Sequence, residues 1–402
     1  MLRSRLFRAT TTQAVFGLSL LLAQGAIADT APVKNGASQI SVTLTGDNGG
    51  QCVLDHNSAA AGPVTFTITN LSAPAISEFE LQSGSRIFGE KENLAPGLPA
   101  STFTVTLDGG EYQIYCPGAA QQKAVAFAVT GNTATHAQGT TADLLNTGTE
   151  GYTRYVDGMV DAMIVAATRL QDDIDNGDLG AAKAAYANAR PFYERIETDV
   201  EGFFLPGFAP TDNAGNLDYL IDMRASNLDP AVGWHGFHAV ERDLFGAGKI
   251  TDDTKALAAE LVANVTKLGT LAKGLTYRPE DLANGAAALL EEVQSGKITG
   301  EEEAFSHIDL VDFAGNVEGA QQAFAFLQPG IRQIDPDLSA RIEAQFTAVL
   351  GMLEEYRDPN ALGGYVTYTN VLRASDAVKL SKAIQNLQEP LAQISEKVAT
   401  AS

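Results

Sequence analysis

One short segment carries residue types that bind metal ions. Residues 233–245 read GWHGFHAVERDLF, with His238 and Glu241 three positions apart and a second imidazole at His235. Side chains three positions apart on a helix project to the same face, so an imidazole and a carboxylate can reach one ion. Such a mixed pair suits iron, zinc or manganese. An H-x-x-E pair also arises often by chance, and taken alone it favours an ordinary polar helix edge.

Other segments add acidic residues and one histidine with spacings that fit a shared site. They are Glu194, Glu197 and Glu201 of YERIETDVE (193–201), Asp222 of LIDMR (220–224), and His307, Asp309 and Asp312 of SHIDLVDF (306–313). A solvated helix face explains part of this set. In helix bundles, however, metal sites are built from carboxylates and histidines that project inward from facing helices. The pattern therefore favours a carboxylate-rich cation site that includes the H-x-x-E pair.

The motifs of hydrolytic enzymes are missing from the chain. A zinc peptidase of the H-E-x-x-H type needs two histidines four positions apart, and no such element occurs. No G-x-S-x-G segment occurs either. A carboxylate-dominated site with one imidazole suits holding a cation better than activating water, although ligand types alone leave hydrolysis open.

The chain changes character near residue 131. From 38 to 130, short alternating runs rich in Val, Thr, Phe and Tyr predict about seven strands and a β-sandwich. Residues 131–150 are small and polar and predict a linker that ends in the start of a helix. Helical periodicity then predicts an all-helical domain over 151–402, large enough for two packed bundles. The predicted helices are 152–175, 179–203, 235–245, 252–274, 280–296, 308–328, 336–357 and 374–398.

The N-terminal residues and the net charge limit the possible location and the possible partners of the protein. Three arginines precede the apolar run AVFGLSLLLA, and AIA at 26–28 is a small-x-small cleavage site, so 1–28 is predicted to be a secretory signal peptide. The mature chain would start at 29, and no later stretch is apolar for long enough to span a membrane. The formal net charge of −22 opposes binding to nucleic acid and attracts cations, although it also keeps an exported protein soluble.

Four stretches resemble the EfeO-type periplasmic iron-uptake proteins. They are GFHAVERDLFG (236–246), YERIE (193–197), ENLAPG (92–97) and GAAALLEEVQSGKITGEEEAFSHIDLVDFAGNVEGAQ (285–321). The helical half is similar to the imelysin-like family, named for a proposed metallopeptidase with an H-x-x-E signature. The resemblance implies an N-terminal all-β cupredoxin-like sandwich (29–130) followed by an all-α imelysin-like domain of two packed helix bundles (151–402).

The resemblance also implies a metal site. The histidine and glutamate of the family motif match His238 and Glu241, a glutamate of the preceding long helix matches Glu197, and a loop aspartate matches Asp222. These four residues would bind ferrous or ferric iron, and their types also suit zinc or manganese. His235, His307 and Asp309 are candidates for orienting a ligand from outside this set.

The family's setting implies a periplasmic location and two partners, an inner-membrane iron permease and a periplasmic haem peroxidase. Two alternatives of other classes use the same cluster. One is an imelysin-type metallopeptidase, and the other is a metal-dependent polysaccharide-binding protein.

The sandwich half raises a separate question about Cys52 and Cys116. The segment EYQIYCPG resembles the last strands of a copper-binding cupredoxin, but Cys116 is followed by neither histidine nor methionine, which argues against a blue-copper site. The cysteines either form a disulfide, which export permits, or bind a second metal, which the resemblance implies to be copper or ferric iron. The disulfide ranks first because it needs no ligand geometry. Further candidate ligands of that second site are Asp55, His56, Glu78, Glu80, Glu90 and Glu92.

Overall fold

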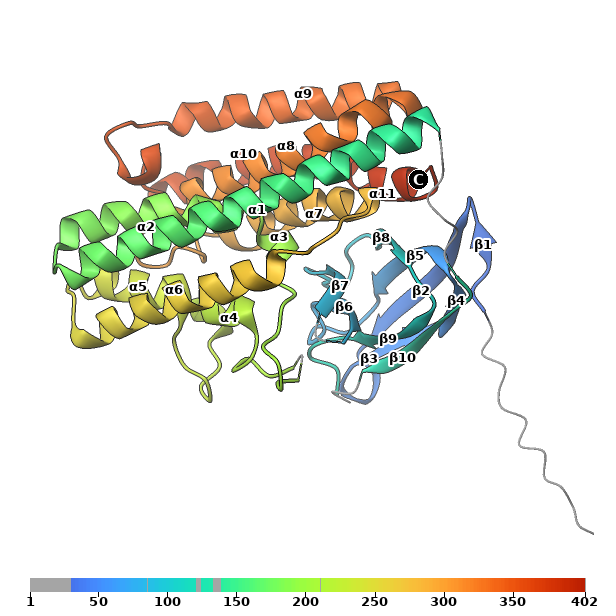
Figure 1. Ribbon diagram of the computed structural model, residues 1–402, viewed down its shortest axis with the longest axis horizontal. Coiled ribbons are helices and arrows are strands. Elements are labelled where there is room, and N and C mark those ends of the chain that lie inside the picture. Colours follow the sequence, from blue (N-terminus) through green and yellow to red (C-terminus); the bar gives the residue numbers. More distant parts are fainter. Residues whose placement is uncertain (1–29, 85, 121–123, 133–138, 210, 402) are drawn as a thin grey trace, which may run out of the picture.

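The computed structural model describes residues 30–84, 86–120, 124–132, 139–209 and 211–401. A β-sandwich up to Thr130 lies beside an elongated helical region that starts at Thr140 (Figure 1). The predicted order, an all-β domain followed by an all-α domain, is confirmed. The predicted signal peptide lies outside the described residues. Within these ranges, no helix combines the length and the apolar character that crossing a membrane requires.

The sandwich consists of two five-stranded sheets. In the first, β2 and β5 are parallel, β8 pairs with β5, and β1 and β3 pair with opposite ends of β2. The second has the order β4-β10-β9-β6-β7. Phenylalanine rings from both sheets meet in the core, with centroids of contacting pairs 5.3 to 5.9 Å apart. The strands are β1 (Val33–Lys34), β2 (Ala37–Thr45), β3 (Gln51–Leu54), β4 (Ser58–Ala60), β5 (Gly62–Asn70), β6 (Phe79–Ser83), β7 (Arg86–Lys91), β8 (Ser101–Leu107), β9 (Gly110–Tyr115) and β10 (Val125–Thr130).

A disulfide joins Cys52 to Cys116. Cys52 belongs to β3 of the first sheet, and Cys116 directly follows β9 of the second, so the bridge links the two sheets. The disulfide interpretation is therefore confirmed. The thiolates of the two cysteines are consumed in the bridge, so neither cysteine is available as a metal ligand.

Removing this bridge should destabilise the protein. The two cysteines are 64 positions apart, and a bridge over a loop of this length restricts the unfolded chain enough to contribute about 2–4 kcal/mol. We expect Cys52→Ser/Cys116→Ser to lose that amount of unfolding free energy in urea titrations. A thiol count on the denatured, unreduced wild type should find no free thiol, and two reactive thiols would contradict the bridge.

The helical region is built around α1 and α8. α1 packs on α2, α6 and α8, while α8 packs on α7 and α9, and α9 packs on α10 (Figure 1). α5 and α7 continue into the π-helical turns η3 (Arg242–Gly246) and η4 (Val293–Lys297). The helices are α1 (Thr140–Asp175), α2 (Leu179–Glu194), α3 (Glu197–Val200), α4 (Leu217–Asp222), α5 (Gly236–Glu241), α6 (Asp252–Ala272), α7 (Pro279–Glu292), α8 (Asp309–Ile334), α9 (Pro336–Leu353), α10 (Asn370–Leu391) and α11 (Ile394–Ala399).

The first helix begins earlier than the sequence analysis predicts. α1 starts at Thr140, so the second half of the segment 131–150, assigned to a linker, is helical. The small residues of this segment read as a linker in sequence, but in the structure they allow α1 to pack closely against α8. A Cβ on Gly148 would lie 2.2 Å from the carbonyl oxygen of Phe326 on α8, so the two helices approach at a glycine.

The end of α8 also differs from the prediction. The pair Pro329-Gly330 is expected to end the helix, yet α8 continues to Ile334. The continuation buries Ile331, which is 2% exposed. A Cβ on Gly330 would meet the side chain of Leu145 at 2.5 Å, so this glycine provides contact with α1 rather than a helix stop.

Helix α7 connects the sandwich to the interior of the helical region. Asn284 donates to the carbonyl oxygen of Thr104 on β8 at 2.7 Å. Lys91 on β7 forms an ion pair of 2.6 Å with Glu291 at the end of α7. The next residue, Glu292, is buried and belongs to a group of carboxylates that is described in the next subsection.

Candidate metal centre

Two short helices bring His238 and Asp222 together. Asp222 is the last residue of α4, and His238 lies in the first turn of α5. Gly236 opens α5 with a φ of 68°, and a Cβ there would lie 2.0 Å from the carbonyl oxygen of Ile221. A glycine is therefore what lets α5 begin against the end of α4. His238 and Asp222 are 1% and 4% exposed, so both are removed from solvent.

Glu241 orients the imidazole of His238. One Glu241 oxygen lies 3.0 Å from His238 Nδ1, and the other accepts the backbone N–H groups of Phe305 at 2.8 Å and Ser306 at 2.6 Å. Both carboxylate oxygens are thus engaged. A metal-binding histidine usually donates its second N–H to a carboxylate in this manner, which leaves the other ring nitrogen for the ion.

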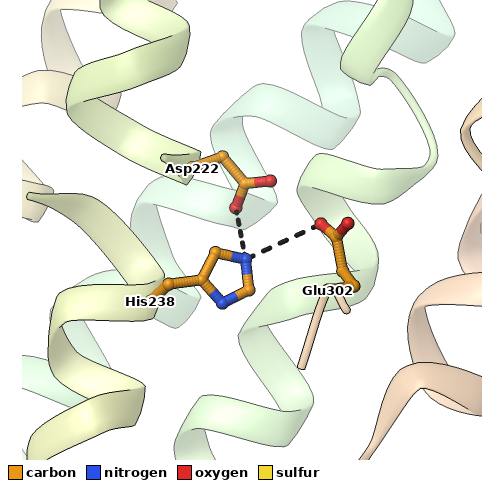
Figure 2. A group of neighbouring side chains, drawn as sticks. All are labelled: Asp222, His238 and Glu302. Carbon is orange, nitrogen blue, oxygen red and sulfur yellow. Dashed lines mark ion pairs between the residues drawn. The ribbon is translucent and has the colours of Figure 1, made fainter. Parts of the chain in front are cut away.

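The other nitrogen of His238 faces two carboxylates (Figure 2). Nε2 lies 3.7 Å from Asp222 Oδ1 and 3.6 Å from Glu302 Oε1, which is too long for a hydrogen bond. It is a buried nitrogen without a hydrogen-bond partner. One ligand atom from each of the three residues lies within 4.8 Å of the others. An imidazole nitrogen with two carboxylate oxygens is a suitable donor set for iron, manganese or zinc.

The turn 298–308 supplies two carboxylates that the sequence analysis missed. Glu302 and Glu303 are 1% and 0% exposed and lie between η4 and α8. Glu303 accepts a hydrogen bond of 2.8 Å from the hydroxyl of Tyr186. In sequence, GEEEAF reads as a solvated turn, and the apolar pair that ends it is the only sign of burial.

Three basic side chains lie among the carboxylates. Arg190 and Lys297 have fully buried side chains, and that of Arg224 is 21% exposed. The carboxylates that contact these bases or His238 form what we call the buried acidic cluster. Its members are Glu194, Glu197, Asp222, Glu241, Glu292, Glu302, Glu303 and Asp312. Three bases leave most of this negative charge uncompensated, so protons or a further cation must supply the rest.

Burial and the neighbouring charges move the pKa values of the carboxyls apart. Burial, and after it the charge of Glu241, raises the pKa of Glu303 to about 8. Burial acts in the same direction on Glu302, but Lys297 and Arg224 outweigh it and hold the pKa of Glu302 well below its usual range. Glu302 is therefore ionised at neutral pH, as a metal ligand must be.

The surroundings of His238 favour a positive charge at its ring. Burial lowers the pKa of His238, as does Arg190, but Glu241, Glu302 and Asp222 outweigh both and raise it well above the usual value. A cation bound at Nε2 would take the place of the proton there.

Glu197 belongs to the buried acidic cluster but does not lie beside His238. A continuous helix over 179–203 was expected to carry it, yet Ile196 has a φ of −134° and interrupts the helix between α2 and α3. The carboxylate of Glu197 instead lies 3.5 Å from Lys297 and 3.3 Å from the amide of Asn316. Glu197 is in none of the groups of neighbouring ligand atoms that the described residues form.

The three residues expected to orient a ligand have different positions. His235 lies 3.1 Å from Glu260 on α6, outside the cluster. His307 is exposed and has a φ of 58°. His307 lies within the turn 298–308, and its backbone N–H donates to the carbonyl oxygen of Glu303 at 2.9 Å. Asp309 is buried, and its carboxylate accepts the backbone N–H of Glu303 at 3.2 Å, so its side chain contacts the turn that holds the cluster glutamates.

The candidate ligands in the sandwich separate into two places. Asp55 and His56 pair with each other at 3.2 Å after β3. The four glutamates Glu78, Glu80, Glu90 and Glu92 lie on or beside β6 and β7. Burial, and then Glu90, raises the pKa of Glu80 to about 7. Among the described residues, each group of three ligand atoms within 4.8 Å lies in the helical region, so the structure assembles no such group here.

Comparison with known proteins places the chain in a family. Residues 148–394 match the family model described as imelysin. The chain is 33% identical over 381 residues to the "Iron uptake system component EfeO" of Escherichia coli (strain K12), covering 94% of this chain and 96% of the relative. The protein of the same name from Shigella flexneri gives the same values. The chain therefore belongs to the imelysin family and, within it, to the EfeO-type proteins.

Proposed function

We propose that this protein binds ferrous or ferric iron between the Nε2 atom of His238 and the carboxylates of Asp222 and Glu302. The observation that carries the proposal is a buried imidazole nitrogen without a partner, facing two carboxylates 3.6 and 3.7 Å away. A cation at this position would acquire hard oxygen ligands and one borderline nitrogen. It would also relieve the excess negative charge of the buried acidic cluster.

In this proposal, the other two predicted ligands have supporting roles. Glu241 fixes the ring of His238 through Nδ1, and Glu197 compensates the ammonium of Lys297 at 3.5 Å. Zinc and manganese suit the same donor atoms, so the assignment of iron rests on the names of the relatives.

The protein would act as the periplasmic component of a bacterial iron-uptake system. It would pass bound iron to an inner-membrane permease and work beside a periplasmic haem peroxidase. Similarity over 94% of the chain to proteins named as iron-uptake components supports this setting. The net charge of −22 would raise the local concentration of cations near the protein surface.

Calorimetric titration tests the site. Wild type, His238→Ala and His235→Ala are titrated anaerobically with Fe²⁺, and with Mn²⁺ as a redox-stable probe. His235 is the matched control, because its imidazole also lies against a carboxylate but outside the cluster. We expect His238→Ala to lose binding and His235→Ala to keep it. Equal affinities for all three proteins would refute the proposed site.

A metallopeptidase is the alternative that the family description leaves open. Peptide hydrolysis at a metal requires an open ligand position that a polypeptide can reach. Here His238, Glu241 and Glu302 are each 1% exposed or less, which argues for an enclosed cation rather than a scissile bond. Cleavage of casein by metal-loaded wild type, absent in His238→Ala, would favour the peptidase instead.

A further inference from the structure

Arg190 occupies a position that a second cation would fit. It lies on α2 with a fully buried side chain and forms ion pairs with Glu194, Glu302 and Asp312 through the same terminal nitrogen, Nη2. Those three carboxylates are themselves one of the groups whose ligand atoms lie within 4.8 Å of one another. The guanidinium thus stands among carboxylates that could otherwise hold a metal ion.

Arg190 also uses the oxygens that face His238. Asp222 Oδ1 pairs with Arg190 Nη1 and lies 3.7 Å from His238 Nε2. Glu302 Oε1 lies 3.3 Å from Arg190 Nη2 and 3.6 Å from His238 Nε2. An iron ion at His238 would therefore need the two oxygen atoms that the guanidinium already contacts.

Two positive charges that share ligands in a buried volume repel each other strongly, since little solvent screens them. We propose that Arg190 is a built-in competitor for the bound cation, which keeps the affinity low enough for the ion to be released again. On binding, the guanidinium gives up Asp222 and Glu302 to the ion. It keeps Glu194 and Asp312, together with Glu303 at 3.1 Å. The inference rests on the proposed iron site.

If Arg190 instead positioned the metal ligands, its removal would change the metal affinity in the opposite direction. If the guanidinium only held Asp222 and Glu302 in place for the ion, its removal would loosen the site and weaken binding. If it competes with the ion, its removal leaves the two carboxylates without a counter-charge and strengthens binding. The sign of the affinity change therefore separates a competitor from a positioning residue.

The test compares metal binding and metal-free stability in Arg190→Met and Arg190→Lys. Calorimetry with Mn²⁺ and with anaerobic Fe²⁺ should show affinity rising at least about tenfold in Arg190→Met, because the repulsion between charges a few ångströms apart is lost. Arg190→Lys keeps the positive charge but makes fewer contacts. Its metal affinity should therefore be intermediate between that of wild type and that of Arg190→Met. Without metal, Arg190→Met should unfold at a lower temperature than wild type. Added metal should raise the unfolding temperature of Arg190→Met by more than it raises that of wild type.

Arg195→Met is the matched control, because Arg195 follows α2 and pairs with Glu318 outside the cluster at 2.7 Å. Its metal affinity should equal that of wild type. Equal or weaker affinity in a folded Arg190→Met protein would overturn the inference. If His238→Ala binds normally, the iron site itself is wrong; if His238→Ala loses binding and Arg190→Met also weakens it, only the competitor role fails.

A structure of the metal-loaded wild type tests the same inference without any substitution, in case Arg190→Met does not fold. The guanidinium should then have left Asp222 and Glu302 while it remains on Glu194 and Asp312. Unchanged contacts of Arg190 with Asp222 and Glu302 around a bound ion would contradict the exchange.

Discussion

Glu302→Gln should reduce iron affinity by more than about a hundredfold while Glu301→Gln leaves it unchanged. Replacing a residue that merely supports a metal ligand typically costs about 10–100-fold in affinity. Glu302 contributes an oxygen that itself faces His238 Nε2 at 3.6 Å, so its loss should cost more. The amide keeps the shape of the side chain and removes its charge.

Glu301 is the matched control because it is the neighbouring glutamate of the same turn. Its carboxylate accepts a hydrogen bond from Ser226 and is not part of the buried acidic cluster. Anaerobic calorimetry with Fe²⁺ on both variants measures the difference. A loss of affinity in Glu301→Gln as large as that in Glu302→Gln would indicate a general effect of acidity, and binding by Glu302→Gln as tight as that of wild type would remove Glu302 from the site.

Lys297→Met should destabilise the metal-free protein by about 3–5 kcal/mol. Breaking a buried ion pair by removing one partner costs this amount, because the remaining charge stays buried and uncompensated. The ammonium of Lys297 has no exposed surface and lies 3.2 to 3.7 Å from Glu194, Glu197, Glu292 and Glu302. Its removal leaves all four carboxylates with less compensation.

Lys379→Met is the control for Lys297→Met. Lys379 pairs with Glu355 at the surface, with both side chains about half exposed or more, and such pairs contribute up to about 1 kcal/mol. Urea denaturation of both metal-free variants gives the two values. A cost for Lys297→Met no larger than that for Lys379→Met would mean that the cluster does not depend on its internal cations.

Regular periodicity made most of the fold predictable. The run that contains Ile40, Val42 and Leu44 alternates between buried and outward side chains along β2, which is the pattern expected of a half-buried strand. Strand β6, FELQS, is buried along four consecutive positions, although apolar and polar residues alternate along it. The period of this run therefore indicates a strand, but the burial of its polar face, Glu80 and Gln82, does not follow from the sequence.

The candidate site was predictable where one helix carries two of its residues. His238 and Glu241 share a helix face, so their spacing alone brought them together. Glu302 and Arg190 come from a turn and from another helix. Their burial is decided by packing that spans more than a hundred positions of the chain, from α2 to the turn before α8. An isolated arginine in ARPFYE and a glutamate in GEEEAF both look like surface residues in sequence.

Of the two residues Asp222 and Glu197, the structure places only Asp222 beside His238. The resemblance matched both residues to ligands of one ion. In the structure, Asp222 faces His238 at 3.7 Å, while Lys297 lies against both Glu197 and Glu302. A break in the helix at Ile196 is the physical reason, since the helical period that would align Glu197 with its neighbours is lost there.

The most direct test of the central claim is anomalous diffraction at the iron absorption edge from crystals grown with iron. We predict an anomalous peak within bonding distance of His238 Nε2, Asp222 and Glu302, inside the helical region. A peak at the glutamates of β6 and β7, or at the protein surface, with none beside His238, would contradict the proposed iron site.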